Sequence, residues 1–342
     1  MNVNNTLLTI AIPTYNRAAF LTRALNSIFI QYDERVEILV SDNASADNTQ
    51  AIAEEFKIKY PQLKYVRNAK NIGPDANFLQ CYNLATGKYV LLLGDDDLLV
   101  EKSLLSLLDF LEETKIDCSL VFLNHVFFEG DYIDIHHCSK PFLAEKQSFV
   151  TSDKSLLMQV ARDRITYMSA FLLRHDAFEQ VVDPIKYSNT SFMHTCIVFE
   201  ATKNENTKFG VFVNPCIAQD SAIENTVFWT RPQEILLVFG QREEYVFCEV
   251  APRFGYDKEL MDKIYTDFLC KSWRGSIIRI KANANKFWKE YYKSYAKPVL
   301  LRHKRAQRKL RPYVFCPAWI AKLIYKCVRP LYRKIRRKKG EI

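Results

Sequence analysis

The stretch Tyr89-Val90-Leu91-Leu92-Leu93-Gly94-Asp95-Asp96-Asp97 decides the fold of this chain. Its five consecutive apolar residues predict a strand that is buried on both faces, as in the middle of a parallel sheet. Three carboxylates follow where the strand must end, and adjacent like charges repel and raise one another's pKa. A divalent cation such as Mg²⁺ or Mn²⁺ would relieve this cost, because hard cations prefer oxygen ligands. Since open α/β sheets bind ligands at the carboxyl ends of their strands, the stretch predicts a metal–phosphate site there.

Short strands alternate with helical patterns through the first third of the chain. The strands expected before the acidic triplet are Thr6–Ile12, which Pro13 stops, Val36–Val40 and Leu63–Val66. A helical pattern follows each of them. This alternation predicts an α/β fold with a mainly parallel, doubly wound sheet.

A polar cluster follows each predicted strand. The clusters are Thr14–Arg17, Asp42–Asp47, Asn68–Gly73 and Asp95–Asp97. In a parallel sheet they converge on one edge. Each cluster alone is typical of a solvated turn between strand and helix, but four together, with an aspartate triplet among them, indicate a binding site.

The composition limits the class of protein. The 342 residues are 48% hydrophobic, which is ample for a large core, and the nine cysteines include no C-x-x-C pair. This cysteine pattern favours reduced thiols in the cytoplasm over disulfides or a zinc site. Neither a signal peptide nor a membrane-spanning helix is expected.

Charge is divided unevenly along the chain. Of the 48 Lys and Arg residues, 20 lie from Lys281 onward, together with only 2 of the 39 Asp and Glu residues. The first 280 residues therefore carry a net charge of −9 and the remainder +18, which gives the net charge of +9. A basic segment after an acidic body predicts an anionic partner for that segment.

Several motifs occur together in one order. They are Pro13-Thr14-Tyr15-Asn16-Arg17, Ser27 with Gln31, Val40-Ser41-Asp42-Asn43-Ala44-Ser45-Ala46-Asp47-Asn48-Thr49, Asn71-Ile72-Gly73 and Leu93-Gly94-Asp95-Asp96-Asp97. In this order and approximate spacing, about the first 115 residues resemble glycosyltransferase family 2. The Gly-Asp-Asp-Asp form especially resembles abequosyltransferase-like and other O-antigen or capsule sugar transferases.

The resemblance implies a GT-A fold, which is a mixed, mainly parallel Rossmann-like sheet flanked by helices. It also implies a nucleotide-diphosphate sugar as donor, Mg²⁺ or Mn²⁺ as cofactor, and in general inversion at the anomeric carbon. Along the chain we expect a nucleotide-sugar-binding half at residues 1–115, an acceptor-binding half at 116–255, and a helical, basic, amphipathic region at 256–342.

The resemblance also implies roles for individual residues. Pro13, Thr14 and Asn16 should line the nucleotide pocket, and Asp42 should accept a hydrogen bond from the base, which suits uracil or thymine better than cytosine.

The Asn71–Gly73 loop, with Asn71 and Gly73 at its ends, should close over the base or ribose. Asp95 should contact the ribose, and Asp96 or Asp97 should bind the metal that bridges the diphosphate. Many relatives have Asp at the position of Gly94, so the register of the triplet stays open.

An inverting transfer also needs a general base that takes the proton from the acceptor hydroxyl. Relatives usually supply it from an acidic pair that opens a helix, but this chain has Met193-His194 at the matching place. His194 is a candidate because the ordinary pKa of histidine lies near neutral pH, and a helix-capping or buried histidine is the alternative. Asp220 is the second candidate and also fits an extra metal contact. Glu200 and Glu224 follow.

Two other features receive weaker interpretations. His136-His137-Cys138 resembles a metal cluster but has no partner cluster at a recognised spacing, so a surface turn is expected. Trp229 is a candidate for stacking against an acceptor sugar.

From about Glu259 the chain is expected to be helical. An apolar stripe between Ile320 and Ile335 lies opposite Lys and Arg residues, which is typical of a helix in a bilayer interface. The alternatives are a docked helix with its basic face in water and a nucleic-acid-binding segment, but no element resembles a groove-reading motif. We therefore expect an anionic membrane surface as partner, no nucleic acid, and a place on the cytoplasmic face of the cell membrane.

These expectations combine into one functional hypothesis. The chain should transfer a sugar from a nucleotide-diphosphate sugar to a saccharide acceptor, which we expect to be lipid-linked, in the biosynthesis of a surface polysaccharide. A nucleotidyltransferase that makes an activated sugar is one alternative, although the Pro13–Arg17 loop lacks the glycines usual in that class. A non-catalytic scaffold that binds nucleotide and metal is the other.

Overall fold

The computed structural model describes residues 6–113, 118–128, 141–143, 147–220, 235–283 and 285–328. The chain forms two compact units, residues 1–221 and 222–342. Some candidate residues lie outside the described part of the chain. They are His136–Cys138, Glu224, Trp229 and the tail beyond Val328.

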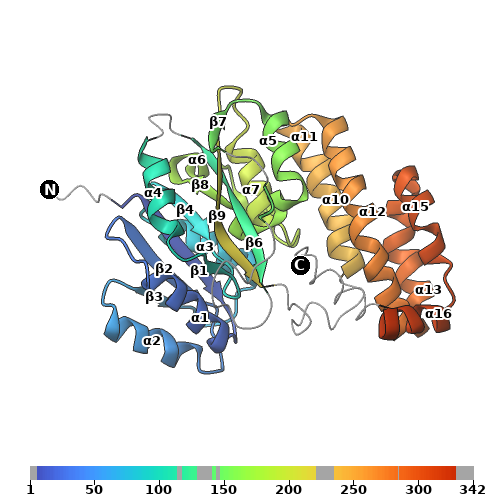
Figure 1. Ribbon diagram of the computed structural model, residues 1–342, viewed down its shortest axis with the longest axis horizontal. Helices are drawn as coiled ribbons and strands as arrows, with labels where there is room; N and C mark the ends of the chain where they lie inside the picture. The colour runs from blue at the N-terminus through green and yellow to red at the C-terminus, as the bar shows by residue number, and fades with distance from the viewer. Residues whose placement is uncertain are drawn as a thin grey trace. The chain divides into compact units, whose positions relative to one another are not determined.

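The first unit contains a mixed sheet with the strand order β3-β2-β1-β4-β8-β6-β9-β5, and β7 pairs with β9 (Figure 1). The strands are β1 (Leu8–Thr14), β2 (Val36–Asp42), β3 (Lys64–Arg67), β4 (Tyr89–Leu92), β5 (Leu98–Leu99), β6 (Leu120–Phe128), β7 (Phe149–Thr151), β8 (Phe171–Arg174) and β9 (Phe209–Asp220). The first four strands are parallel to one another, and β8 runs antiparallel to β4 and β6. The parallel arrangement that the sequence predicts for the first third is confirmed, and the antiparallel strand β8 makes the whole sheet mixed.

Helices cover the sheet (Figure 1). They are α1 (Ala18–Phe29), α2 (Thr49–Lys59), α3 (Pro74–Leu84), α4 (Ser103–Glu113), α5 (Lys154–Ala161), α6 (His175–Glu179) and α7 (Met193–Ala201), with short 3-10 turns at Arg162–Thr166, Met168–Ala170 and Pro184–Tyr187. Alternate residues of β1 join one buried cluster with apolar side chains of α1, α2 and α4. Helix α3 contacts β1, β2 and β4, and also packs on α7.

The structure corrects one strand boundary. Strand β1 does not stop at Pro13 but continues to Thr14, with Pro13 paired opposite Ser41 of β2. On its other side, β1 pairs with β4 only as far as Ala11. Beyond Ala11 the strand is an edge toward β4, and a proline without an N–H is tolerated at an edge.

The second unit is helical throughout its described part. It contains π-helical turns at Leu237–Arg242, Val246–Val250, Tyr292–Ala296 and Ile324–Val328, a 3-10 turn at Asn285–Phe287, and the helices α10 (Glu243–Tyr245), α11 (Ala251–Arg253), α12 (Lys258–Asn283), α13 (Trp288–Tyr291), α14 (Lys297–Arg302), α15 (Lys304–Val314) and α16 (Ala318–Leu323). Both α15 and α16 pack on α12, where the Lys281 ammonium donates to the carbonyl oxygen of Val314 at 2.7 Å. Among the described residues, no helix is both long enough and apolar enough to cross a bilayer.

Candidate active site

The carboxyl ends of β1, β2 and β4 bring several predicted site residues together. Thr14 lies opposite Asp42 in the β1–β2 register, so both residues end their strands at the same edge. The Thr14 hydroxyl donates to Asp95 Oδ2 at 2.8 Å, although 81 residues separate the two in the sequence. The first strand and the acidic triplet thus form one site, as the topology predicts.

Arg17 connects the triplet to the loop after β1. Its Nη1 donates to Asp95 Oδ1 at 2.7 Å and to Asp96 Oδ2 at 2.9 Å. Burial alone would lower the pKa of Arg17, but the charges of Asp95 and Asp96 raise it above its ordinary value. Arg17 therefore remains a cation and offsets part of the negative charge of the triplet.

The third carboxylate is held by a different segment. The Ser169 hydroxyl donates to Asp97 Oδ2 at 2.6 Å and accepts the N–H of Gly94 at 2.9 Å. Asp97 is 4% exposed, whereas the Asp96 side chain is 28% exposed. Ser169 fixes Asp97 inside the protein, and Asp96 faces toward solvent.

Ionised carboxylates are unfavourable in the buried part of the triplet, and a bound metal ion would stabilise them. Burial raises the pKa of Asp95 to about 6, although Arg17 counteracts this shift. Burial, followed by the charge of Asp96, also raises the pKa of Asp97 well above its ordinary value. Arg17 thus pairs with two of the three carboxylates, and the oxygen donors of the triplet suit a hard divalent cation. The residues present fit Mg²⁺ or Mn²⁺.

Gly94 is required by the position of Asp97. A Cβ atom at residue 94 would lie 2.7 Å from Asp97 Oδ2, which is closer than such atoms approach. Since Ser169 holds this carboxylate, an added methyl group must displace it. Gly94 therefore leaves room for Asp97 to turn inward.

Replacing Gly94 by alanine is expected to lower the sugar-transfer activity that the sequence predicts by up to about 10²-fold, because small displacements of a catalytic group are costly. Steady-state kinetics measures the loss. Gly275→Ala is the matched control, because no atom lies within 4 Å of a Cβ there and activity should not change. Equal activity of Gly94→Ala and wild type would contradict the steric argument.

Asp42 is buried in a second part of the site. It is fully buried, its Oδ1 accepts the N–H of Ser45 at 2.8 Å, and its Oδ2 accepts the hydroxyl of Tyr65 at 2.8 Å. Asn16, which has a φ of 55°, accepts the N–H of Ala46 at 2.6 Å. Asn16 thus joins the loop after β1 to the loop after β2, and Asp42 connects the end of β2 to β3. Their contacts with a nucleotide remain predictions.

The loop before α3 is organised by an asparagine that the sequence did not single out. Asn43 Nδ2 donates to Asn71 Oδ1 at 3.1 Å and to the carbonyl of Gly73 at 3.2 Å, and Asn43 Oδ1 accepts the N–H of Ile72 at 2.9 Å. Gly73 has a φ of 86°, a conformation that favours glycine, and it directly precedes Pro74 at the start of α3. This places the Asn71–Gly73 loop beside the end of β2.

His194 does not have the pKa that suggested it as the base. It lies in the first turn of α7, 5% exposed, between Phe78 and Phe171. Burial lowers its pKa to about 4. Its Nε2 lies 2.9 Å from the carbonyl oxygen of Thr166, so this nitrogen carries the hydrogen and donates. The near-neutral pKa expected from sequence is wrong, and the structure matches the buried alternative.

The pairing of β5 with β9 indicates where Asp220 lies relative to the triplet. Strands β5 and β9 are antiparallel with Leu98 opposite Ala218, so residues after Ala218 run beside residues before Leu98. This register leads Asp220 toward Asp96. Asp220 also pairs with Arg23 Nη1 at 3.4 Å.

Glu200 instead accepts the Tyr187 hydroxyl at 2.7 Å and pairs with Lys186 at 2.7 Å. These contacts indicate a structural role for Glu200.

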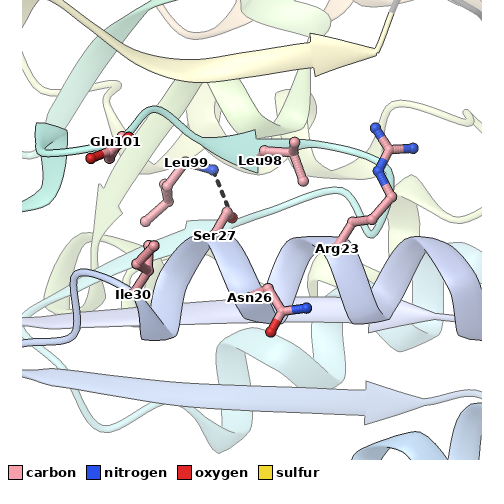
Figure 2. Close-up of a pocket in the computed structure, with 7 residues that line it drawn as sticks. All are labelled: Arg23, Asn26, Ser27, Ile30, Leu98, Leu99 and Glu101. Atoms are coloured by element: carbon pink, nitrogen blue, oxygen red, sulfur yellow. Dashed lines mark hydrogen bonds between the residues drawn. The ribbon is translucent and has the colours of Figure 1, made fainter. Parts of the chain in front are cut away.

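A pocket of about 280 Å³ lies between α1 and β5 (Figure 2). Arg23 lines it and connects it to Asp220, while Ser27 at its floor accepts the N–H of Leu99 at 3.1 Å. None of the predicted donor-site residues lines this pocket.

Buried polar atoms near Asp97 form a region that the sequence did not reveal. Asp97 raises the pKa of Tyr167, after the larger effect of burial. The Tyr167 hydroxyl also interacts with Asp97 by a hydrogen bond, and the ring nitrogens of His125 and Arg164 Nε are buried as well. Only the polar character of residues 162–169 could have indicated this region.

Comparison with known proteins gives a consistent result. Residues 9–182 match the family model described as Glycosyl transferase family 2, which is about half of the chain. Abequosyltransferase RfbV of Salmonella typhimurium is 28% identical over 202 residues, which cover 56% of this chain and 60% of that protein. GalNAc(5)-diNAcBac-PP-undecaprenol beta-1,3-glucosyltransferase of Campylobacter jejuni is 33% identical over 102 residues, which cover 30% and 33% of the two chains. The chain thus spans less than two thirds of either relative.

Among solved structures, residues 1–349 of TarS from S. aureus, in complex with UDP-GlcNAc, have a similar fold. The TM-score is 0.60 at 18% identity, and the match covers 96% of this chain and 92% of that one. This similarity, together with the strand order, confirms the expected GT-A fold.

Proposed function

The chain belongs to glycosyl transferase family 2, and from this membership we propose that it moves a sugar from a nucleotide-diphosphate sugar to a saccharide acceptor, with inversion at the anomeric carbon. The observation that carries the proposal is the joining of Thr14, Arg17 and the acidic triplet at one sheet edge. The names of the two relatives, an abequosyltransferase and a glucosyltransferase of an undecaprenol-linked saccharide, support a surface-polysaccharide acceptor.

Each residue of the donor half has a proposed task. Pro13, Thr14 and Asn16 line the nucleotide pocket, and Asp95, oriented by Thr14, accepts from the ribose hydroxyls. Asp96 and Asp97 would hold Mg²⁺ or Mn²⁺, which when bound neutralises the charge that develops on the leaving diphosphate.

The remaining donor contacts concern the nucleoside. Asp42 Oδ2 accepts from Tyr65 and also pairs with Arg67 at 3.5 Å, so the second lone pair of Oδ1 would accept an N–H of the base, and Asn71 and Gly73 cover the nucleoside.

The donor itself is the direct test. Thermal-shift screening of nucleotide-diphosphate sugars, with and without Mn²⁺, should show one donor that stabilises the protein, by about 2.7 kcal/mol at 100 times its Kd. Uracil and thymine nucleotides are tested first because Asp42 is a carboxylate. A donor that binds but is never transferred to any saccharide would favour the scaffold alternative.

The triplet predicts a pH dependence. A buried carboxyl whose pKa is raised to about 6 holds its proton more tightly in the folded than in the unfolded state. Without divalent ions, the free energy of unfolding should therefore fall by on the order of 2 kcal/mol as the pH rises from about 4 to about 6. Since metal competes with these protons, Mn²⁺ should raise Tm at pH 7.5 much more than at pH 5. A Mn²⁺ effect that is equal at both pH values would contradict this assignment.

We further propose that the protein works on the cytoplasmic face of the cell membrane. Trp319 and Leu323 lie four residues apart on α16 and are 69% and 54% exposed, and Phe315, just before this helix, is 69% exposed. Arg311, Lys322 and Lys326 are exposed beside them. Although α16 docks on α12, it therefore presents an apolar stripe with basic neighbours, which suits an anionic bilayer interface.

The double variant Phe315→Ser/Trp319→Ser is expected to lose most of its binding to vesicles that contain anionic lipid, measured by co-sedimentation. Donor-induced thermal stabilisation should be unchanged. Ile58→Ser provides the control, because Ile58 is 84% exposed on α2 and belongs to the other compact unit. Retained vesicle binding in the double variant would reject α16 as the contact.

A further inference from the structure

We propose that the helical unit binds a transition-metal ion, Zn²⁺ by its chemistry, between Cys248, Asp262 and His303. Cys248 lies in the π-helical turn Val246–Val250, Asp262 lies on α12, and His303 lies between α14 and α15. One ligand atom of each residue lies within 4.8 Å of the other two. The site is separate from the acidic triplet, which belongs to the first compact unit.

The distances fit a small tetrahedral site. His303 Nδ1 lies 3.3 Å from Asp262 Oδ1, and Cys248 Sγ lies 4.0 Å from the same oxygen. Ligand atoms bound to zinc at about 2.0–2.3 Å are separated by roughly 3.3–3.8 Å in a tetrahedron. Only small side-chain adjustments would bring the three atoms to these separations.

Glu244 orients the histidine for this task. Its Oε1 lies 2.8 Å from His303 Nε2, and Arg302 pairs with the same carboxylate. Because a carboxylate accepts, Nε2 carries a hydrogen, and in the neutral imidazole the lone pair is on Nδ1. A carboxylate partner behind a ligating histidine is a common arrangement around zinc, where it fixes the tautomer.

The other side of the ring also suits a cation. In the neutral imidazole the lone pair of Nδ1 lies 3.3 Å from Asp262 Oδ1, and an ion bound by both atoms would relieve the repulsion between them. The Thr266 hydroxyl, 3.0 Å from Nδ1, is the competing partner and would rotate away when an ion binds. An imidazolium held between Glu244 and Asp262 is the alternative without metal.

The ligand types select the ion. A thiol, an imidazole and a carboxylate suit Zn²⁺ better than Mg²⁺ or Mn²⁺. Cys248 is partly exposed and Asp262 is exposed, so an ion has access and a fourth position is open to water. Burial, followed by the charge of Asp262, raises the pKa of Cys248 to about 12, so binding would displace the thiol proton to solvent as the metal–sulfur bond forms.

Co²⁺ substitution tests the site without depending on activity. The chelator-treated full chain is titrated with Co²⁺ in the presence of excess Mg²⁺, which occupies the triplet. We expect one equivalent to give a thiolate-to-cobalt charge-transfer band that Zn²⁺ removes. Cys248→Ser should abolish this band, whereas Cys316→Ser, which changes another free, partly exposed cysteine of the unit, should retain it.

Two further variants sharpen the test. Glu244→Gln should keep the band and weaken Zn²⁺ binding by about 10–100-fold, as expected for loss of an orienting partner. Asp262→Asn should weaken Zn²⁺ binding with the fold retained, checked by circular dichroism. Absence of the band in the wild type, or its persistence in Cys248→Ser, would overturn the proposal and assign His303 to an imidazolium pair.

Discussion

Replacing Asp97 by asparagine is expected to reduce sugar transfer by roughly 10²–10³-fold, the loss typical of removing one group that stabilises developing charge. The same change should raise Tm. Asp97 is buried, and its raised pKa shows that its ionised form is costly in the folded protein. Asparagine keeps the shape and still accepts from Ser169, but it carries no charge. Lower activity together with higher stability is expected when a functional group lowers the free energy of unfolding.

The companion variant Asp96→Asn separates the members of the triplet. Asp96 is more exposed and pairs with Arg17, so its loss should reduce activity without a gain in Tm. Asp109→Asn is the control, because Asp109 is half exposed on α4 and lies 3.9 Å from Arg35. Release of nucleoside diphosphate, measured with and without Mn²⁺, reports the effect. Unchanged turnover in both triplet variants would contradict the proposed metal–diphosphate site.

The first four strands and helices could be predicted because their signals are local. Leu21, Leu25 and Ile28 recur on one face of α1 and are fully buried, and β4 is apolar along its whole length. Parallel strands then place their carboxyl ends at one edge. The proximity of Thr14, Asp42 and the triplet therefore follows from topology alone, without an alignment.

Contacts between distant segments could not be predicted in this way. Ser169 is 72 residues from Asp97, and nothing in its neighbours marks it as the partner of a carboxylate. The low pKa of His194 could not be predicted for the same reason. Its low pKa comes from burial beside Phe78 and Phe171, and burial by distant residues leaves no local pattern.

The helices of the second unit are hard to predict from the sequence for a different reason. Its described part is helical from Ile235, well before the expected start near Glu259. The π-helical turns Leu237–Arg242 and Val246–Val250 contain more residues per turn, so they shift the apolar stripe and obscure the 3.6-residue period. The same folding brings Cys248, Asp262 and His303 together without any recognised metal-binding spacing in the sequence.

Replacing Asp220 by asparagine is expected to lower kcat by about 10²–10⁴-fold, the range for losing a general base. The donor KM and donor-induced stabilisation should stay unchanged. The expectation rests on the β5–β9 register, which leads Asp220 toward Asp96, and on Arg23, which pairs with Asp220 at 3.4 Å. His194 lacks this position, because its Nε2 faces the carbonyl of Thr166 inside the protein.

The distinction between base and metal contact decides how this variant is interpreted. A base acts on the acceptor, so Asp220→Asn should still bind donor and Mn²⁺ with wild-type affinity while transfer fails. A metal contact would instead reduce the Mn²⁺-dependent rise in Tm. Glu200→Gln is the matched control, since Glu200 bonds Tyr187 and Lys186 and should affect stability more than kcat. A wild-type kcat in Asp220→Asn would exclude Asp220 as the base. Glu224, which follows β9 in the sequence, would then be the next candidate.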